Sequence, residues 1–225
     1  MVRFSFSRKI LTAALCAGAF FIPVKLKAAA LVMAAPKPAH NSVFIQINAN
    51  QNEARQADAK KFVNSMANRG IGFLSNPDFT REQQIAEFRT LLKDNFDMAR
   101  IGRFAMGTYW RSASEKERRE YLKLFEKKVV DAYAGRFAEY GGQELEVRDT
   151  RPEGKKDILV QSVILDNTGP EVNVDWRVRY SNGGYKVIDV VVEGVSMALT
   201  QRSDFASVIQ RGGGDVGVLI AHLKE

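Results

Sequence analysis

One acidic residue stands out as a candidate catalytic group. Asp189 lies inside the apolar run of residues 185–192, and a carboxylate in such surroundings can act as a general base. The alternative is structural, because buried charges are usually paired and Arg177 or Arg179 across the expected hairpin could provide the partner. The structural interpretation is the stronger of the two.

Other catalytic arrangements lack the residues that they need. The two histidines, His40 and His222, lie near opposite ends of the chain, whereas nucleophilic catalysis needs an imidazole beside the nucleophile. No cluster of His and Cys suggests a metal site, and the glycines at 212–214 follow no strand, so we interpret them as a flexible break. We therefore expect no metal, no cofactor and no enzymatic activity.

Three arginines near the middle of the chain could meet an anionic group. Arg100, Arg103 and Arg111 are interpreted first as solvated charges at helix ends, which is the usual role of such residues. Contact with anionic head groups is the alternative.

The first 34 residues predict an export signal. Basic residues at 3, 8 and 9 precede an apolar run at 10–24, and about 15 residues are fewer than the roughly 20 of a membrane-spanning helix. Candidate cleavage sites follow residues 28–30 (AAA) or 32–34 (VMA). We expect a periplasmic protein with a signal peptide at 1–34, a flexible lead-in segment at 35–52 and one domain at 53–225.

Net charge and cysteine content support this division. Five basic residues and no acidic one lie in the first 30 residues, so the formal net charge falls from +7 to +2 for a chain that starts at Leu31. A nearly neutral domain gives little reason to expect nucleic-acid binding. The only cysteine, Cys16, also lies in the leader, so the exported chain would have no thiol to mispair.

The elements around Asp189 are predicted by alternating side chains. Apolar and polar residues alternate through 172–180, the two-residue period of a strand with one buried face, and Asn182-Gly183 suits a tight hairpin turn. Residues 185–192 are apolar on both faces, which predicts a central strand. Beyond them, Ser203 or Asp204 could cap a helix that runs through Arg211.

The rest of the chain divides into helices and strands. Apolar residues at helical spacing predict a helix near 59–66, interrupted at 70 and 72. Three more helices are expected after predicted caps: a capping box of Thr80 and Gln83, the Asp97 side chain, and a capping box at 114–117, the last helix stopping at 141–142. Two more strands are expected at 144–150 and 157–165, and a last short helix at 215–223. The fold class is therefore α+β, with N-terminal helices packed on one face of a four-stranded antiparallel sheet.

Two segments carry a family resemblance. GRFAMGTYWR at 102–111 and EGVSMALTQRS at 193–203, within about residues 55–224, resemble the MlaC family, also called the toluene-tolerance or Tgt2 family. The resemblance implies a periplasmic lipid-binding component of a phospholipid ABC transport system, whose helices and sheet enclose acyl chains in an apolar cavity. VDWRVR at 174–179, together with the segment at 193–203, is most similar to the branch associated with hopanoid biosynthesis. The implied ligand is therefore phospholipid by family and hopanoid by branch.

The resemblance also implies where the ligand lies and which partners are involved. The partners would be an inner-membrane ABC transporter complex and, as a further candidate, an outer-membrane lipoprotein complex, with transient membrane contact. The lining would come from inward apolar positions of the long helix and the sheet. On this chain these positions are Phe104, Tyr109, Phe125, Val129, Tyr133, Trp176, Val178, Val190, Val192 and Met197.

Three hypotheses of function remain at this point. The first is a soluble carrier that shuttles phospholipid or hopanoid between membranes. The second is an enzyme that acts on a hydrophobic substrate with Asp189 as general base, and the third is an adaptor with a solid core. Periodicity alone does not distinguish a packed core from a lined cavity, since both place apolar residues inside.

Overall fold

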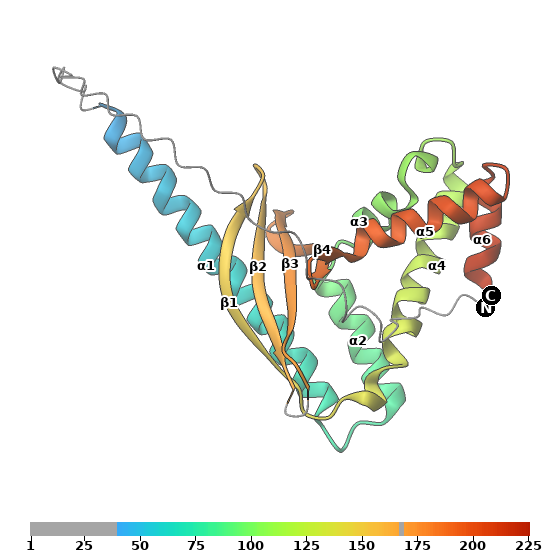
Figure 1. The fold of residues 1–225 in the computed structure, drawn as a ribbon, viewed down its shortest axis with the longest axis horizontal. Coiled ribbons are helices and arrows are strands. Elements are labelled where there is room, and N and C mark those ends of the chain that lie inside the picture. Colours follow the sequence, from blue (N-terminus) through green and yellow to red (C-terminus); the bar gives the residue numbers. More distant parts are fainter. Residues whose placement is uncertain (1–39, 167–168) are drawn as a thin grey trace, which may run out of the picture. The chain divides into compact units, whose positions relative to one another are not determined.

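The computed structural model describes the backbone of residues 40–166 and 169–225, and the side chains within these ranges from residue 50 onward (Figure 1). The predicted signal peptide at 1–34 lies outside the described residues. Residues 49–225 form one unit, and residues 40–48 are the beginning of the first helix.

Two helices precede the region of the predicted site. Helix α1, His40–Leu74, begins within the lead-in segment that was expected to be flexible, and it continues through Gly70 and Gly72. Two glycines cost about 1 kcal/mol each in a helix, but Phe73 beyond them is buried, so packing sustains the last turn. Helix α2, Arg81–Asn95, starts with the predicted capping box of Thr80 and Gln83.

The next helices also begin at their predicted caps. Helix α3, Met98–Met106, is capped by Asp97, and helix α4, Glu115–Ala134, starts with a capping box of Ser114 and Glu117. Between them lies the 3-10 helix η1, Gly107–Trp110. Helix α4 ends earlier than the predicted stop at 141–142, because the chain turns there into a second 3-10 helix, η2, Phe137–Glu139.

The sheet is an antiparallel meander of five strands in sequence order rather than the predicted four. The fifth strand arises because Glu193 and Gly194 adopt positive φ angles of 49° and 78°, a turn that folds the chain back onto the end of β4. The strands are β1, Glu144–Glu153; β2, Asp157–Leu165; β3, Val172–Ser181; β4, Gly184–Val192; and β5, Val195–Ser196.

The apolar character of β4 had predicted a central strand. The structure instead places β4 next to the short edge strand β5. The α2–α3 junction covers the remainder of its edge, where the Asp97 N–H donates to the carbonyl of Val187 at 3.0 Å. Coverage by helices and by this junction, rather than a central position, therefore explains why few polar residues occur in β4.

The chain ends in two helices. Helix α5, Met197–Arg211, begins before the predicted caps Ser203 and Asp204, because Ser196 follows β5 directly and its Oγ accepts the Leu199 N–H at 3.1 Å. Helix α6, Val216–Lys224, agrees with the predicted last helix and is capped by Asp215.

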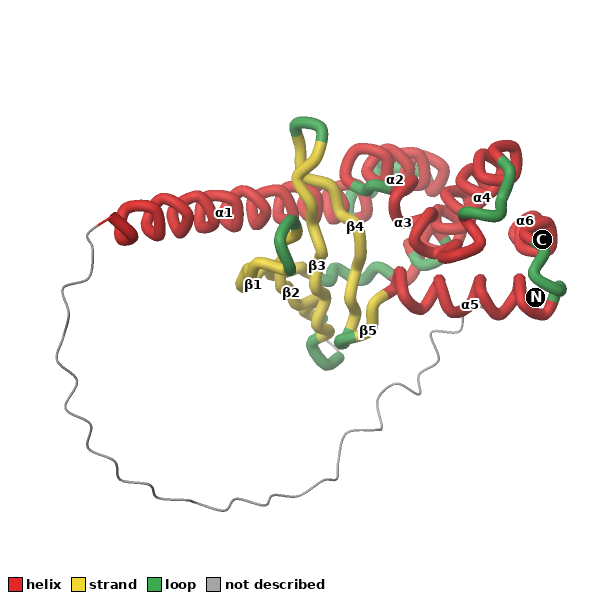
Figure 2. Tube along the Cα trace, turned by 90° about the horizontal axis from the view of Figure 1, so that it is seen from above, coloured by secondary structure: helices red, strands yellow, loops and turns green. Residues whose placement is uncertain are grey.

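One face of the sheet is apolar and carries helices, as predicted (Figures 1 and 2). Ala59, Val63 and Met66 of α1 pack on this apolar face, together with Leu91 of α2, and form the sheet core. The opposite face carries Asp157 and its charged neighbours. Strand pairing places the following residues on the apolar face: Ile158, Val160, Ser162, Val174, Trp176, Val178, Val187, Val190 and Val192.

A second apolar cluster, the helical core, lies among η1 and helices α3 to α6. Tyr121, Ile209 and Leu219 are fully buried there. Figure 2 shows these helices gathered beyond the β4 edge of the sheet. The unit therefore contains two apolar cores that are joined along β4, β5 and the α2–α3 junction.

Candidate functional site

The apolar face of the sheet is fully covered near the β3–β4 hairpin and less completely covered further along β4, although Val174, opposite Val192, is also buried. Val178 and Val187 are fully buried beneath α1, whereas Trp176, Val190 and Val192 are only half-buried. We call these last three residues the open end of the apolar face. Trp176 lies directly opposite Val190 in the β3–β4 register, so the three side chains form one continuous apolar surface.

The polar group of Trp176 is satisfied inside the sheet. Its indole Nε1–H donates to Ser162 Oγ at 3.0 Å, and that hydroxyl donates to the carbonyl of Val174 at 2.6 Å. Ser162 is itself buried. Since the indole nitrogen needs no further partner, the surface that Trp176 leaves exposed is hydrocarbon and suits an apolar ligand.

The long helix α4 contributes half-exposed residues of its own. Burial raises the pKa of the Tyr133 phenol, and the charge of Arg136 offsets only part of this effect, yet 45% of Tyr133 remains exposed. Tyr133 is therefore packed against other side chains on part of its surface and accessible on the rest. The ring of Phe88 from α2 lies 6.1 Å from that of Tyr133. Val129, one turn earlier, is half-buried and also packs against the helical core.

The remaining predicted lining residues lie in different surroundings. Phe125 belongs to the closed helical core, and Tyr109 packs against that core. Val178 lies in the closed part of the sheet core. Phe104 is 40% exposed and lies beneath the guanidinium of Arg202, 5.2 Å from its ring centre, while Met197 is the half-buried first residue of α5.

Two hollows occur at other places on the described surface. One, of about 340 Å³, lies between α5 and α6 and is lined by Val208, Val218 and His222 among others. The second, of about 180 Å³, lies where α1 meets the β1–β2 turn and includes Arg55 and Asp157. Neither contains a predicted lining residue, and the enclosed apolar cavity stays a prediction.

The predicted lining omitted two contributors to this region. Phe137 lies beyond the end of α4, but η2 brings its ring to 5.3 Å from Phe88, edge to face. Ser162 had no distinguishing pattern, although it satisfies the indole of Trp176. Only its place in a strand register opposite Val174 could have indicated that role.

Asp189 is held by hydrogen bonds from the start of α5. Its Oδ2 accepts from Ser196 Oγ at 2.6 Å, and its Oδ1 accepts from the Ala198 N–H at 3.0 Å. The predicted partners are therefore wrong, because Arg177 and Arg179 both pair with Asp157 instead. Asp189 joins β4 to α5, on the opposite face of the strand from Val190.

The described part of the chain contains no group of three histidine, cysteine or acidic residues that could hold a metal ion. Within the same residues, no helix combines the length and apolar character required to cross a bilayer.

The fold and its apolar surfaces define a class of α+β proteins in which helices cover one face of an antiparallel meander. Residues 47–225 match the family described as MlaC protein, and the chain belongs to this family. This confirms the resemblance seen in the sequence to the MlaC and toluene-tolerance proteins.

Individual relatives agree with this assignment. The chain is 25% identical over 108 residues to toluene tolerance protein ttg2D of Pseudomonas putida, covering 48% of this chain and 50% of that protein. It is 23% identical over 145 residues to the intermembrane phospholipid transport system binding protein MlaC of Haemophilus influenzae, covering 61% and 67%. The chain thus spans half of the first relative and about two thirds of the second.

A solved structure is similar over most of the fold. It is that of the phospholipid-binding protein from Ralstonia solanacearum in complex with a phospholipid, with a TM-score of 0.65 and 27% identity. The match covers 74% of this chain and 95% of that one.

Proposed function

We propose that this protein is a lipid carrier that binds the acyl chains of a phospholipid, or the ring system of a hopanoid, and moves it between membranes. The open end of the apolar face carries the proposal, because Trp176 turns its one polar group inward and leaves hydrocarbon beside Val190 and Val192. The printed descriptions of the Haemophilus and Ralstonia proteins, which name phospholipid transport and phospholipid binding, support it.

We propose a narrower lining than the sequence had suggested. Trp176, Val190 and Val192 would form the sheet side, and Val129 and Tyr133 would form the helical side. Phe125 and Val178 would stabilise the two cores beneath these walls, since each is almost fully buried among other side chains.

The energetics of such a carrier require no chemical step. Burial of about 15 methylenes is worth at most on the order of 12 kcal/mol, at roughly 0.8 kcal/mol per group. The same hydrophobic free energy holds the lipid in its bilayer. The site therefore needs only to bind the acyl chains about as strongly as the membrane does. Transfer then depends on docking to a donor and an acceptor, for which we propose an inner-membrane ABC transporter complex and an outer-membrane lipoprotein complex.

We also propose that the protein is exported to the periplasm. A carrier between membranes must reach the periplasm, and the basic and apolar halves of residues 1–34 would direct it there. N-terminal sequencing of the secreted protein should give a start between residues 31 and 36, whereas intact residues 1–30 on cytoplasmic protein would contradict export.

Extraction of the bound lipid is the direct test. Protein purified from its own host is extracted with organic solvent, and the extract is analysed by mass spectrometry. A carrier should yield phospholipid or hopanoid in near-stoichiometric amount, and a Val190→Trp variant should yield much less because the indole would occupy the lipid's space. An adaptor with a solid core should yield none.

The enzyme alternative receives no support from the surroundings of Asp189. Both carboxylate oxygens accept hydrogen bonds from the start of α5, which leaves the group engaged in holding two elements together. Turnover of a hydrophobic substrate that is abolished by Asp189→Asn, with folding and lipid intact, would restore that alternative.

A further inference from the structure

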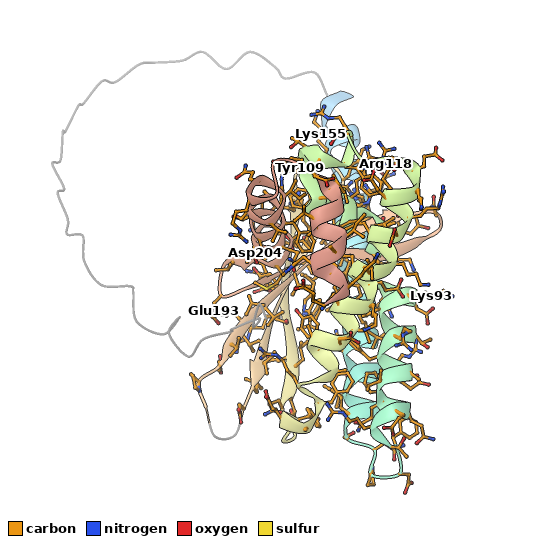
Figure 3. The ribbon with its side chains drawn as sticks, turned by 90° about the vertical axis from the view of Figure 1, so that its right-hand side faces the viewer. Lys93, Tyr109, Arg118, Lys155, Glu193 and Asp204 are labelled. Atoms are coloured by element: carbon orange, nitrogen blue, oxygen red, sulfur yellow. The ribbon has the colours of Figure 1, made fainter. Side chains whose placement is uncertain are left out.

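Positive charge is concentrated in one segment of the helices α3 to α6, which we call the helical layer. Residues 98–119 carry six basic and two acidic side chains, a formal net charge of +4, whereas the remainder of the chain from residue 31 carries −2. The segment comprises α3, η1 and the start of α4. Figure 3 shows Tyr109 and Arg118 close to one another at one end of this layer, away from Lys93.

Two guanidinium groups lie against Trp110 within this segment. The guanidinium carbons of Arg103 and Arg118 are 5.9 and 5.4 Å from the centre of its ring system. Arg118 also donates from Nε to the carbonyl of Trp110 at 2.9 Å and from Nη2 to that of Arg111 at 3.3 Å. A ring face and neutral carbonyls hold a guanidinium in place without cancelling its charge.

Most other arginines that are fixed in this fold are held by carboxylates. Arg100, in the same segment, binds Asp97 at 2.8 Å, and Arg69 binds Asp94 at 2.9 Å. By contrast, Arg103, Arg111 and Arg118 have no carboxylate partner among the described residues. Their charges therefore remain available to an anion outside the protein.

We propose that Arg103, Arg111 and Arg118, arranged around Trp110, form a docking surface for a membrane that carries anionic phospholipid head groups. A guanidinium presents parallel N–H donors that match phosphate oxygens, and tryptophan is typical of the boundary between membrane and water. The surface would hold the protein against the membrane that donates or accepts its lipid.

The composition of the surface favours a membrane over an acidic protein partner. Stable protein interfaces have a centre of buried apolar or aromatic side chains within a polar rim. Trp110 is itself half-buried, and four exposed residues around it are polar: Arg103, Thr108, Arg111 and Ser112. The large exposed apolar residue of this segment, Phe104, is 40% exposed and lies beneath the guanidinium of Arg202. Such a surface offers charge to a layer of phosphates but no apolar centre to a protein.

Vesicle flotation tests this surface without reference to the bound lipid. The full chain and an Arg103→Glu/Arg111→Glu variant are mixed with vesicles of equimolar phosphatidylcholine and phosphatidylglycerol, or of phosphatidylcholine alone. Each basic residue near an anionic surface contributes measurably to binding, so the variant should partition at least about tenfold more weakly to the anionic vesicles. Neither protein should bind neutral vesicles, and added salt should weaken wild-type binding.

The matched control is Arg89→Glu/Lys93→Glu, which makes the same change in net charge on α2. Both side chains are exposed, and neither charged group has a partner among the described residues. The control should keep vesicle binding within about twofold of wild type, because head-group attraction falls off within a Debye length.

Two results would overturn the proposal. One is equal flotation of the Arg103→Glu/Arg111→Glu variant and the wild type, which would also be the result if an acidic protein were the partner. The other is equal loss in the α2 control, which would indicate that net charge alone controls binding. Circular dichroism checks folding, and if the glutamate variant unfolds, Arg103→Gln/Arg111→Gln should show the same loss in smaller degree. The amount of lipid extracted from the variant should equal that from the wild type. A failure of the membrane-docking proposal can therefore be distinguished from a failure of the proposed carrier function.

Discussion

The two apolar cores are built from similar residues, but their side chains are buried to different extents. In the helical core, Tyr121 is fully buried, its hydroxyl donates to the carbonyl of Gly102 at 2.8 Å, and its ring contacts those of Phe125 and Phe205 with centroids 5.8 and 5.9 Å away. In the sheet core, burial is complete at Val178 but incomplete at Val190 on the same face.

In the proposed carrier, this difference would separate the residues that stabilise the fold from those that bind lipid. A closed core gains free energy from dense packing, so nearly every buried atom there contributes to the folded state. An open apolar surface gains little from its exposed part, and an exposed apolar patch in a soluble protein indicates a binding site. The comparison therefore predicts opposite responses to substitutions in the helical core and at the open end of the apolar face.

The largest loss of stability is expected for Phe125→Ala. The ring is almost fully buried against Tyr121 and Phe205, and its removal should lower the free energy of unfolding by about 3–5 kcal/mol. Urea denaturation of delipidated protein measures this change. Tyr133→Ala on the same helix is the control and should cost less, because 45% of that side chain is exposed. Unchanged stability with lost lipid would instead place Phe125 in the cavity wall.

A pair of identical substitutions on one sheet face gives the next largest effect. Val178→Trp enlarges a fully buried side chain and should cost about 1–3 kcal/mol or more, whereas Val190→Trp should cost less than about 1 kcal/mol. Val190→Trp should nevertheless reduce co-purified lipid, while Val178→Trp that still folds should retain it. Melts must be compared after delipidation, because lipid that binds only the folded state adds stability.

The opposite result would remove the distinction between the two ends of the face. If delipidated Val190→Trp melted as low as Val178→Trp with its lipid content unchanged, the open end would be part of a solid core, and the lining proposed for the sheet side would be wrong.

Asp157→Asn tests the polar face of the sheet, which binds no lipid in our proposal. Burial alone would raise the pKa of Asp157, but hydrogen bonds from Arg179 and Arg177, at 2.8 and 2.9 Å, outweigh burial and lower it below its usual value. A carboxyl with a lowered folded-state pKa stabilises the fold above its unfolded-state pKa and loses this contribution as the pH falls through the folded-state pKa.

Wild-type stability should therefore decrease as the pH falls below about 4, and Asp157→Asn should remove part of that decrease. Near neutral pH the substitution should lower the free energy of unfolding by about 1–2 kcal/mol. The loss is limited because Arg177 is partly exposed, so water replaces part of its interaction with the carboxylate. Lipid content should not change. Urea denaturation at a series of pH values provides the measurement, and identical pH profiles for the two proteins would exclude the predicted linkage.

The smallest effect is expected at the junction between the two cores. Asp189→Asn keeps one acceptor oxygen but exchanges the other for an N–H₂ donor, so one of the two hydrogen bonds from Ser196 and Ala198 is lost. The cost should be about 1 kcal/mol, with lipid retained. Loss of lipid from a protein of normal stability would mean that the junction controls access to the site.

Much of the local structure could be predicted because its determinants are local. The capping boxes at Thr80 and Ser114 and the Asp97 cap each depend on a few adjacent residues, and all three are confirmed. The alternation in β3 placed Trp176 and Val178 on one face, and the positive φ angle at Asn182 agrees with the predicted hairpin turn. The antiparallel order of the strands followed from their short connections.

The errors occurred where distant segments decide the outcome. Strand β4 was predicted to be central because its residues are apolar, but helices and the α2–α3 junction bury it from beyond the sheet edge. The start of α5 was placed too late, because Ser196 becomes a cap only when β5 turns back onto β4. Asp189 was assigned to arginines that bind Asp157 instead.

The sequence by itself determined the α+β class, the family resemblance and which side of β3 is apolar, since periodicity and motifs are properties of neighbouring residues. Only the tertiary structure decided that Val178 is covered while Val190, on the same face, is half-open, because coverage depends on where α1 crosses the sheet. The same reason separates Phe125 from Tyr133 on one helix. Apolar spacing identifies the residues that avoid water, but the packing of distant elements decides which of them contact protein and which are left for a ligand.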